Sequence, residues 1–418
     1  MAKRNQTSER SAKKPAVVSL FSGAGGLDLG LEAAGYAIRL CVENDADARE
    51  TLRKNRPGWK LAEPGDIHRA DPETFTSQAG LARGEVALLA GGPPCQPFSK
   101  SAYWSNGGSR GLKDPRSKTL HAFLDFVEVA LPQVLLLENV KALASNGTDE
   151  ALRLFQNELR RINRRHKTSY SLQAIILNAA DYGVPQIRER VFLLASIDGQ
   201  TISLPPATHG DANGLERFRT CWDAIGDLDV ADWPEELNPT GKWAGLLRSI
   251  PEGQNYLWHT PRGPGEPLFG WRTRYWSFLL KLAKDQPSWT IQADPGPATG
   301  PFHWTSRLLS IEEMARLQTF PSGYRIEGGR RSGHRQVGNA VPCALGELLG
   351  LEIRRQLFRE RVRHCLHLIP AQRNDCPARE RRGKVPESYL AFRAKHKDHP
   401  GTGKGPAARA RERAQRTA

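Results

Sequence analysis

The chain has 418 residues, of which 39% are hydrophobic and 25% charged, a composition typical of a folded protein with room for two ordinary domains. No stretch approaches the roughly 18 consecutive apolar residues of a membrane-spanning helix, and no apolar region follows the basic N-terminus to form a secretory signal. The six cysteines contain no CxxC pair, so we expect no disulfide framework and a reducing, cytoplasmic environment.

The net charge of +15 is concentrated at the two ends of the chain. Residues 1–14 contribute +4 and residues 371–418 contribute +8, which leaves only +3 for the rest. Basic tails of this kind attract a polyanion such as DNA, and they are equally typical of solvated segments that aid solubility. We therefore predict largely disordered basic tails over 1–14 and 366–418, without assigning them a role in DNA binding.

Short apolar runs alternate with helical patterns from Pro15 onward. The predicted strands are 16–21, 38–44, 86–91, 134–139, 171–177 and 190–196, and the predicted helices between them are 29–34, 118–131 and 149–163. Buried strands separated by helices are typical of a parallel sheet covered on both faces. Residues 15–200 are therefore predicted to form a doubly wound α/β domain.

The composition changes after Ile197 to a Pro-, Gly- and Trp-rich sequence with weak periodicity. Seven of the ten tryptophans lie between Ile197 and Phe302, which predicts a smaller, loop-rich domain over 201–332. Helical order returns at 306–320, where Ser310 and Glu313 have the spacing of a capping box. A last helical pattern, from Cys343 to about 363, lies within 333–365, which we expect to complete the first domain.

A glycine-rich turn follows the first strand, with glycines at 23, 25 and 26. Such a turn lets the backbone approach a ligand and presents helix N-terminal amides to it. Alone it is weak evidence, because it departs from GxGxxG and tight packing explains it equally well. Glu43 and Asp66 end the next two elements, and their order along the βα series favours a nucleotide-like ligand over isolated surface acids or helix caps.

The sequence GGPPCQPFS at 91–99 presents Cys95 directly after a predicted strand. Its three prolines and two glycines restrict the loop and hold the thiol at the C-terminal edge of the sheet, where doubly wound folds bind ligands. A cysteine without such a context is usually an inert apolar residue. In this loop it is a candidate nucleophile, provided that its surroundings lower its pKa.

Two further groups are predicted at the same edge. Glu138 ends the strand 134–139, and the alternation of Gln186, Arg188 and Arg190 places these three side chains on one face of an extended segment. An isolated trio of this kind is equally typical of a solvent-exposed strand edge without a functional role. Together with Cys95, these residues indicate a thiolate (Cys95), a general acid (Glu138) and a cationic clamp formed by the arginines.

These motifs resemble those of the C5-cytosine DNA methyltransferases. The matching segments are FSGAGGLDLG (21–30), Glu43, Gly65-Asp66-Ile67, GGPPCQPFS (91–99), Glu138-Asn139-Val140, QIRER (186–190), RLLSIEEMARLQTFP (307–321) and QVGNAVP (336–342). They occur in the family's order and cover residues 16 to about 350, without a missing catalytic element. The chain length resembles that of bacterial modification enzymes.

The resemblance implies a Rossmann-like domain that binds S-adenosyl-L-methionine. In this family Glu43 would hold the ribose and Asp66 the adenine amino group. The other cofactor-binding positions implied are Phe21, Gly23, Gly25, Leu27, Ile67, Pro93, Leu120, Asn339 and Val341.

The resemblance also implies the chemistry. Cys95 would attack C6 of a cytosine flipped out of the DNA, which makes C5 nucleophilic enough to accept the methyl group. Glu138 would contact N3 and the amino group, Arg190 the carbonyl O2, and Arg188 the thiolate or a phosphate. The base that removes the C5 proton is not identified, and segment 100–116 is expected to close over the DNA.

The partners implied are double-stranded DNA and a cognate restriction endonuclease, with a monomeric enzyme acting at the bacterial nucleoid. The small domain would read the target sequence, and the candidate DNA-binding residues are Ser99, Gln186, Arg262, Arg272 and Arg274. No metal is assigned, because His364, Cys365, His367 and Cys376 do not match a zinc spacing.

Three other functions are weighed at this point. A related tRNA cytosine methyltransferase would carry a Cys-Phe-Thr signature, which this sequence lacks. A catalytically silent DNA-binding regulator would not need Cys95, Glu138, Arg188 and Arg190 intact. A dinucleotide-dependent oxidoreductase would use the glycine turn but not the loop around Cys95.

Overall fold

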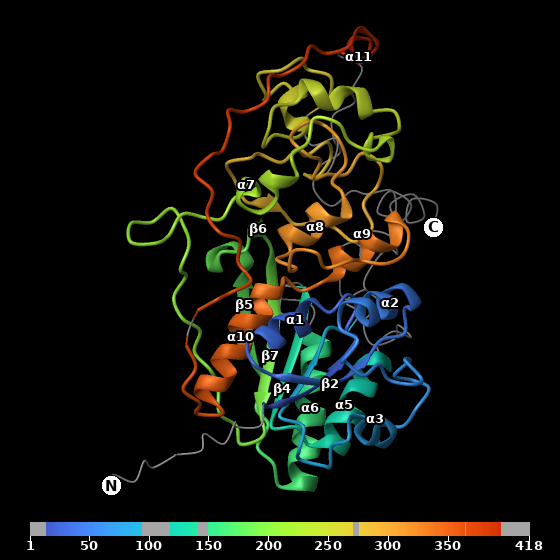
Figure 1. The fold of residues 1–418 in the computed structure, drawn as a ribbon, viewed down its shortest axis with the longest axis vertical. Helices are drawn as coiled ribbons and strands as arrows, with labels where there is room; N and C mark the ends of the chain where they lie inside the picture. Colours follow the sequence, from blue (N-terminus) through green and yellow to red (C-terminus); the bar gives the residue numbers. More distant parts are fainter. Residues whose placement is uncertain (1–13, 94–117, 141–148, 271–275, 364, 394–418) are drawn as a thin grey trace, which may run out of the picture.

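The computed structural model describes residues 14–93, 118–140, 149–270, 276–363 and 365–393. Along its long axis the molecule has two parts, with a sheet and its helices at one end and a loop-rich part at the other (Figure 1). In the described part of the chain, no helix combines the length and the apolar character needed to cross a membrane.

A six-stranded sheet forms the centre of the first part. Its strands, in spatial order, are β2 (Ala37–Val42), β1 (Ala16–Leu20), β3 (Leu88–Gly91), β4 (Val134–Val140), β7 (Glu189–Ser196) and β5 (Gln173–Asn178). Each lies where the sequence predicted a strand, which confirms the α/β class. The pairs β2–β1, β1–β3 and β3–β4 are parallel, whereas β7 runs antiparallel to both of its neighbours.

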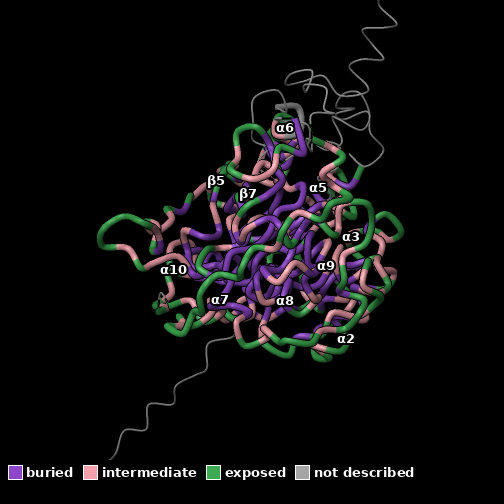
Figure 2. The backbone as a smooth tube through the Cα atoms, turned by 90° about the horizontal axis from the view of Figure 1, so that it is seen from above, coloured by how far each residue is buried: buried purple, intermediate pink, exposed green. Residues whose placement is uncertain are grey.

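Helices cover both faces of the sheet, as the periodicity predicted. Side chains alternate along β1, so that Val17 packs in one apolar cluster and Val18 in the other. The first cluster includes α1 (Gly26–Ala33) and α10 (Cys343–Gln356), and the second includes α3 (Pro72–Ala79), α5 (Lys118–Ala130) and α6 (Asp149–His166). Figure 2 shows the buried chain between these layers. The helix α10 ends at Gln356, earlier than expected.

Three more helices lie near the C-terminal edge of the sheet. They are α2 (Ala46–Asn55), α8 (Ile311–Leu317) and α9 (Arg330–Asn339). Ser310 caps α8, with Glu313 completing the capping box, as the sequence predicted. The carboxylate of Glu313 also accepts hydrogen bonds of 2.8 and 2.6 Å from buried Arg307. The sequence did not predict α9, because its residues are mostly polar and carry no clear apolar periodicity.

The loop-rich part has a core of its own. That cluster includes Leu246, Tyr256, Phe269, Phe278 and Phe302. Apart from β7, the regular elements between β5 and α8 are short: η4 (Ala179–Tyr182), β6 (Gln186–Ile187), α7 (Cys221–Ile225), η5 (Gly226–Leu228), η6 (Glu235–Leu237), η7 (Ala244–Ser249), η8 (Tyr256–His259) and β8 (Ser288–Trp289). The strands β6 and β8 pair in parallel and join the two parts.

Residues 366–393, which we call the C-terminal strap, run along the loop-rich part to α11 (Glu387–Leu390) (Figure 1). Trp222 donates a hydrogen bond of 3.0 Å to Asp375, and the ammonium of Lys284 lies 2.6 Å from the Glu380 carboxylate. Tyr389 donates to the carbonyl of Lys242. A largely disordered tail was expected over 366–418. Residues 366–393 are instead packed through contacts that link residues about 100 or more positions apart, which the sequence pattern does not reveal. Residues 394–418 and 1–13 lie outside the described residues.

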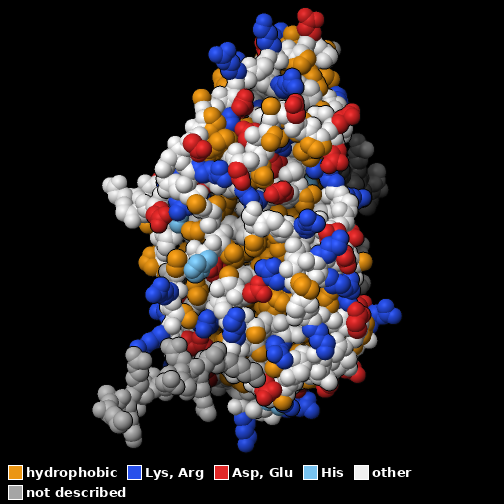
Figure 3. All heavy atoms as spheres, viewed as in Figure 1, with side chains coloured by type: hydrophobic (Ala, Val, Ile, Leu, Met, Phe, Trp, Pro, Cys, Tyr) orange, Lys and Arg blue, Asp and Glu red, His pale blue; other side chains and the backbone are white. Residues whose placement is uncertain are grey.

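Basic and acidic side chains are interspersed over the face shown in Figure 3. This mixture agrees with the small charge excess of the chain between its two basic ends.

Candidate active site

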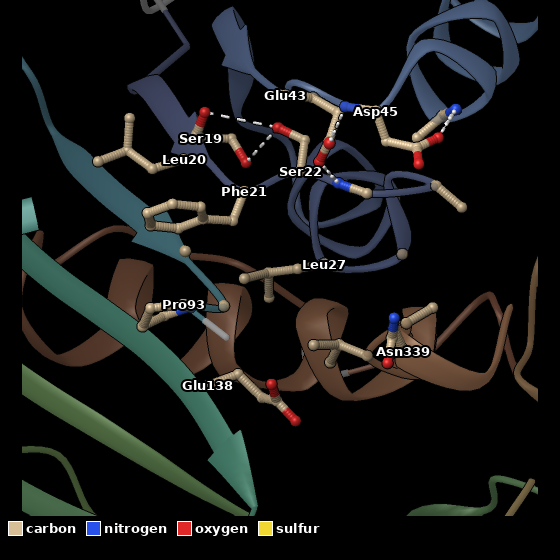
Figure 4. Close-up of a pocket in the computed structure, with 18 of the residues that line it drawn as sticks. Ser19, Leu20, Phe21, Ser22, Leu27, Glu43, Asp45, Pro93, Glu138 and Asn339 are labelled. Carbon is tan, nitrogen blue, oxygen red and sulfur yellow. Dashed lines mark hydrogen bonds between the residues drawn. The ribbon is translucent and has the colours of Figure 1, made fainter. Parts of the chain in front are cut away.

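A pocket of 490 Å³ lies at the C-terminal ends of β1, β2, β3 and β4. In Figure 4, Glu43, Ser22 and Asp45 lie along one side of it, with Asn339 and Glu138 along the opposite side. Twelve residues predicted for cofactor binding or catalysis line this pocket: Phe21, Gly23, Leu27, Glu43, Asp66, Ile67, Pro93, Glu138, Arg188, Arg190, Asn339 and Val341. Segments that are far apart in the sequence are therefore brought together at one sheet edge.

The glycine turn holds the backbone close to two walls of the pocket. Gly23 has a φ of +53°, a conformation that side chains with a Cβ rarely adopt. A Cβ on Gly26, the first residue of α1, would lie 2.3 Å from the carbonyl oxygen of Val341. The glycine at 26 therefore allows the N-terminus of α1 to pack against the segment that follows α9.

We predict that Gly26→Ala lowers both stability and cofactor affinity. The added methyl group must displace the Val341 backbone, and overpacking of this kind costs about 1–3 kcal/mol. Thermal unfolding and equilibrium binding of the cofactor would measure the two effects. Gly58→Ala is the matched control, because a Cβ there has no atom within 4 Å. Equal melting temperatures for the two variants would contradict the prediction.

Glu43 fastens the glycine turn to the end of β2. One carboxylate oxygen accepts a hydrogen bond of 2.7 Å from the Gly23 N–H, and the other accepts one of 2.7 Å from the Asp45 N–H. Burial raises the pKa of Glu43, and these backbone donors partly offset the rise. The oxygens retain lone pairs that can accept hydroxyl donors, which fits the predicted contact with a ribose.

Asp28 is a pocket residue that the sequence analysis missed, because nothing in its position within α1 distinguishes it from a surface acid. Its side chain is fully buried. Burial raises the pKa of Asp28 to about 7, although the neighbouring Ser19 hydroxyl favours the charged form. The folded protein therefore binds this proton more tightly than the unfolded chain does.

The raised pKa of Asp28 predicts a pH-dependent contribution to stability. The stabilising effect of the bound proton is present below about pH 4 and is lost as the pH rises through about 7. Asp28→Asn removes this loss, because asparagine does not titrate. The free energy of unfolding of the variant, relative to that of the wild type, should therefore rise by up to about 4 kcal/mol between pH 4 and 8. Urea unfolding across this range measures the difference, with exposed Asp232→Asn as the control. A constant difference between wild type and Asp28→Asn would contradict this account.

Glu138 and Arg190 form an ion pair at the other end of the pocket. Arg190 lies opposite Val140 in the antiparallel pairing of β4 and β7, which brings its guanidinium Nε to 2.8 Å from the Glu138 Oε1. Burial raises the pKa of Glu138, while Arg190 and Arg188 lower it in part. The arrangement provides a buried carboxyl and a cation side by side, as predicted.

Asn139 contacts Pro93, which precedes Cys95 by two residues in the sequence. Its side-chain amide donates a hydrogen bond of 3.1 Å to the carbonyl of Pro93, which itself lines the pocket. Asn139 belongs to a motif found in the sequence, but no role was predicted for it. Cys95 and Ser99 lie outside the described residues, and so does segment 100–116.

The side chains of Gln186 and Arg188 are buried, at 0% and 1% exposed. The Arg188 guanidinium donates to the carbonyls of Ile291, Gly338 and Ala340, at 3.1, 2.8 and 3.0 Å. These contacts connect Arg188 with the loop-rich part and with the C-terminal end of α9. Its role beside the thiolate or a phosphate stays a prediction. The Gln186 amide donates to the carbonyl of Leu317, and its oxygen accepts from Arg188 and from the Ile291 N–H. Its role in DNA binding stays a prediction.

Two predicted cofactor residues do not line the pocket. A Cβ on Gly25 would face Leu52, Tyr324 and Trp59, so this glycine serves packing between α1 and its neighbours. Leu120 packs against the apolar cluster below the sheet, while the adjacent Thr119 lines the pocket instead.

Of the other predicted DNA-binding residues, Arg262 is exposed on the loop-rich part, and Arg272 and Arg274 lie outside the described residues.

Comparisons with known proteins give a consistent result. A family model described as C-5 cytosine-specific DNA methylase matches residues 16–355. The chain is 36% identical over 373 residues to the Type II methyltransferase M.SacI of Streptomyces achromogenes, a match that covers 82% of this chain and 93% of that protein. It is 33% identical over 338 residues to the Type II methyltransferase M.NgoFVII of Neisseria gonorrhoeae, covering 79% and 84%.

Among solved structures, one similar fold is that of a putative DNA modification methyltransferase encoded within a prophage of E. coli. It has a TM-score of 0.56 and 19% sequence identity, and the match covers 82% of this chain and 99% of that chain. This likeness supports the Rossmann-like methyltransferase fold.

Proposed function

Because the chain belongs to the C-5 cytosine-specific DNA methylase family and is a DNA cytosine-5-methyltransferase, we propose a specific reaction for it. It transfers a methyl group from S-adenosyl-L-methionine to C5 of a flipped-out cytosine in a specific double-stranded DNA sequence. The reaction passes through a covalent bond between Cys95 and C6 of the base. The observation that carries this proposal is the buried Glu138–Arg190 pair, which lines the same pocket as Glu43.

The pocket residues fit S-adenosyl-L-methionine. The volume of 490 Å³ lies within the range of about 300–1,000 Å³ of small-molecule sites. Glu43 provides a carboxylate for ribose hydroxyls, and Asp66 provides one for an amino group. Gly23 lies beside Glu43 and leaves this wall of the pocket without a side chain. When bound, S-adenosyl-L-methionine supplies an activated methyl group.

The residues at the other end of the pocket suit the activation of cytosine. Attack of the Cys95 thiolate on C6 forms a carbon–sulfur bond and moves an electron pair toward N3. Glu138, whose pKa burial raises, donates a proton or hydrogen bond at N3, and Arg190 stabilises the charge at O2. After C5 has gained the methyl group, loss of the C5 proton expels the Cys95 thiolate. N3 then returns its proton to Glu138, and the aromatic ring is restored. The base that accepts this proton is left unassigned.

The cytosine must leave the stacked duplex for this attack, at a cost of a few kcal/mol. We assign target recognition to the loop-rich part, because it adjoins the pocket through the β6–β8 pair and Arg188. Ser99, Gln186, Arg262, Arg272 and Arg274 remain the candidates for DNA contacts. The catalytic domain in this proposal consists of residues 15–200, completed by about 333–365.

The biological setting that we propose is restriction–modification in the bacterial cytoplasm. Type II in the names of similar proteins refers to this setting. A cognate endonuclease that cuts the same sequence would be the partner, and the enzyme would act on the nucleoid DNA as a monomer.

Methyl transfer from labelled S-adenosyl-L-methionine to unmethylated bacterial DNA tests the proposed reaction. Digestion to nucleosides followed by mass spectrometry identifies the labelled base, and tRNA is the parallel substrate. We expect the label only in 5-methyldeoxycytidine. Label in a methylated exocyclic amino group, or in tRNA alone, would overturn the proposal.

A further inference from the structure

An ion pair links two walls of the cofactor pocket. Arg335 Nη2 lies 2.9 Å from Asp45 Oδ2, and the two side chains are 43% and 36% exposed. Both residues line the pocket, Asp45 from the junction of β2 and α2 and Arg335 from α9. Because deeper residues such as Glu43 are 9% exposed, the pair lies at the solvent edge of the pocket.

The pair completes a continuous series of contacts around the pocket. Gly23 donates to one oxygen of Glu43, and the Asp45 N–H donates to the other. The Asp45 carboxylate then contacts Arg335 through one oxygen and caps α2 through the other, which accepts from the Ala48 N–H at 3.0 Å. Arg335 precedes Asn339 by four residues, so both lie on one face of α9. The glycine turn is thereby connected to the wall that carries Asn339.

A second ion pair joins the same segments away from the pocket. Lys54 of α2 lies 3.1 Å from Glu327, just before α9, and neither residue lines the pocket. Comparing the two pairs therefore separates an effect on the bound cofactor from general stabilisation of the α2–α9 contact.

We propose that the Asp45–Arg335 ion pair positions the two walls around bound S-adenosyl-L-methionine and slows its release. This inference rests on the proposed function, which assigns that ligand to the pocket. Release requires the solvent edge to open, and the pair opposes this opening. Neither residue touches the reacting atoms, so both act as positioning residues.

The test measures the dissociation constant, the dissociation rate and the KM of S-adenosyl-L-methionine in Arg335→Gln and Asp45→Asn. In Asp45→Asn, asparagine can still cap α2, and Arg335→Gln does not change the residue that caps this helix. Each variant should bind S-adenosyl-L-methionine about three- to fivefold more weakly, as expected for a partly exposed pair. The weaker binding should come from faster dissociation, and kcat should stay unchanged. The double variant should be no weaker than either single variant. Arg335→Lys should restore most of the affinity, and high salt should reduce the difference.

Lys54→Gln is the matched control and should leave cofactor binding unchanged. Equal weakening by Lys54→Gln and Arg335→Gln would overturn the inference in favour of general stabilisation. Normal affinity in Asp45→Asn with weakened binding in Arg335→Gln would also overturn it, because Arg335 would then contact the cofactor by itself. If the wild-type protein does not bind S-adenosyl-L-methionine at all, the proposed function fails and this inference fails with it.

Discussion

Cys95→Ala is expected to abolish methyl transfer while S-adenosyl-L-methionine still binds. Alanine cannot form the bond to C6, so C5 stays a weak nucleophile, and we expect kcat to fall roughly 10⁴-fold or more. The proposed cofactor contacts come from other residues, among them Glu43 and Leu27, which line the pocket. Transfer of labelled methyl groups measures the loss, and calorimetry measures cofactor binding.

The matched comparison for Cys95→Ala is the wild-type protein at the same concentration, with unfolding temperature as a check on folding. An affinity for S-adenosyl-L-methionine within about twofold of wild type is expected, since the pocket walls are unchanged. Substantial transfer by a folded Cys95→Ala protein would contradict the covalent mechanism. It would leave the family assignment intact, because that assignment does not depend on this residue alone.

Glu138→Gln is expected to reduce kcat by about 10²–10⁴-fold, the range for loss of a general acid. Glutamine has nearly the same shape and can still contact the base, but it cannot deliver a proton to N3. It also leaves Arg190 without the carboxylate that lies 2.8 Å away. Because breaking a buried ion pair lowers stability, kcat must be measured below the unfolding temperature of the variant.

The pH dependence distinguishes proton donation from a structural effect of Glu138→Gln. Burial raises the pKa of Glu138, so more of this carboxyl is protonated near neutral pH than in an exposed glutamate. Wild-type kcat should therefore fall as the pH rises through that pKa, and the residual kcat of Glu138→Gln should not show this fall. Identical pH profiles for the two proteins would contradict the role of Glu138 as the acid.

The sequence predicted the sheet and the edge at which the site lies. Apolar runs such as 134–139 identify buried strands because a parallel sheet is covered on both faces. Functional groups directly after such strands meet at one edge, and Glu43 and Glu138, both expected at strand ends, line one pocket there. The capping box of Ser310 and Glu313 is a local signal and was predicted for the same reason.

Features that depend on distant contacts were not predicted. The alternation of side chains along an extended segment places Gln186 and Arg188 on one face of it. It does not show which face is covered by other parts of the protein. Burial of these side chains depends on the pairing of Gln186 with Ser288, about 100 residues away. The antiparallel direction of β7 is likewise set by the connections of the sheet and not by the pattern of that strand.

For the same reason, the C-terminal strap and the Asp45–Arg335 pair were not predicted. A basic, proline-containing segment such as 366–393 resembles a disordered tail unless its partners are known, and here they are residues such as Trp222 and Lys284. Asp45 and Arg335 are 290 residues apart, so only the folded chain brings them together.

The most direct measurement of the central claim is bisulfite sequencing of DNA from a methylation-deficient bacterial host that expresses this chain, with Cys95→Ala as the control. We predict protected cytosines confined to one short sequence with the wild-type protein and none with the variant. This result would establish C5 methylation, its sequence specificity and its dependence on Cys95 together. A genome that stays unmethylated although folded protein is present, or the same protected sites with Cys95→Ala, would contradict the account.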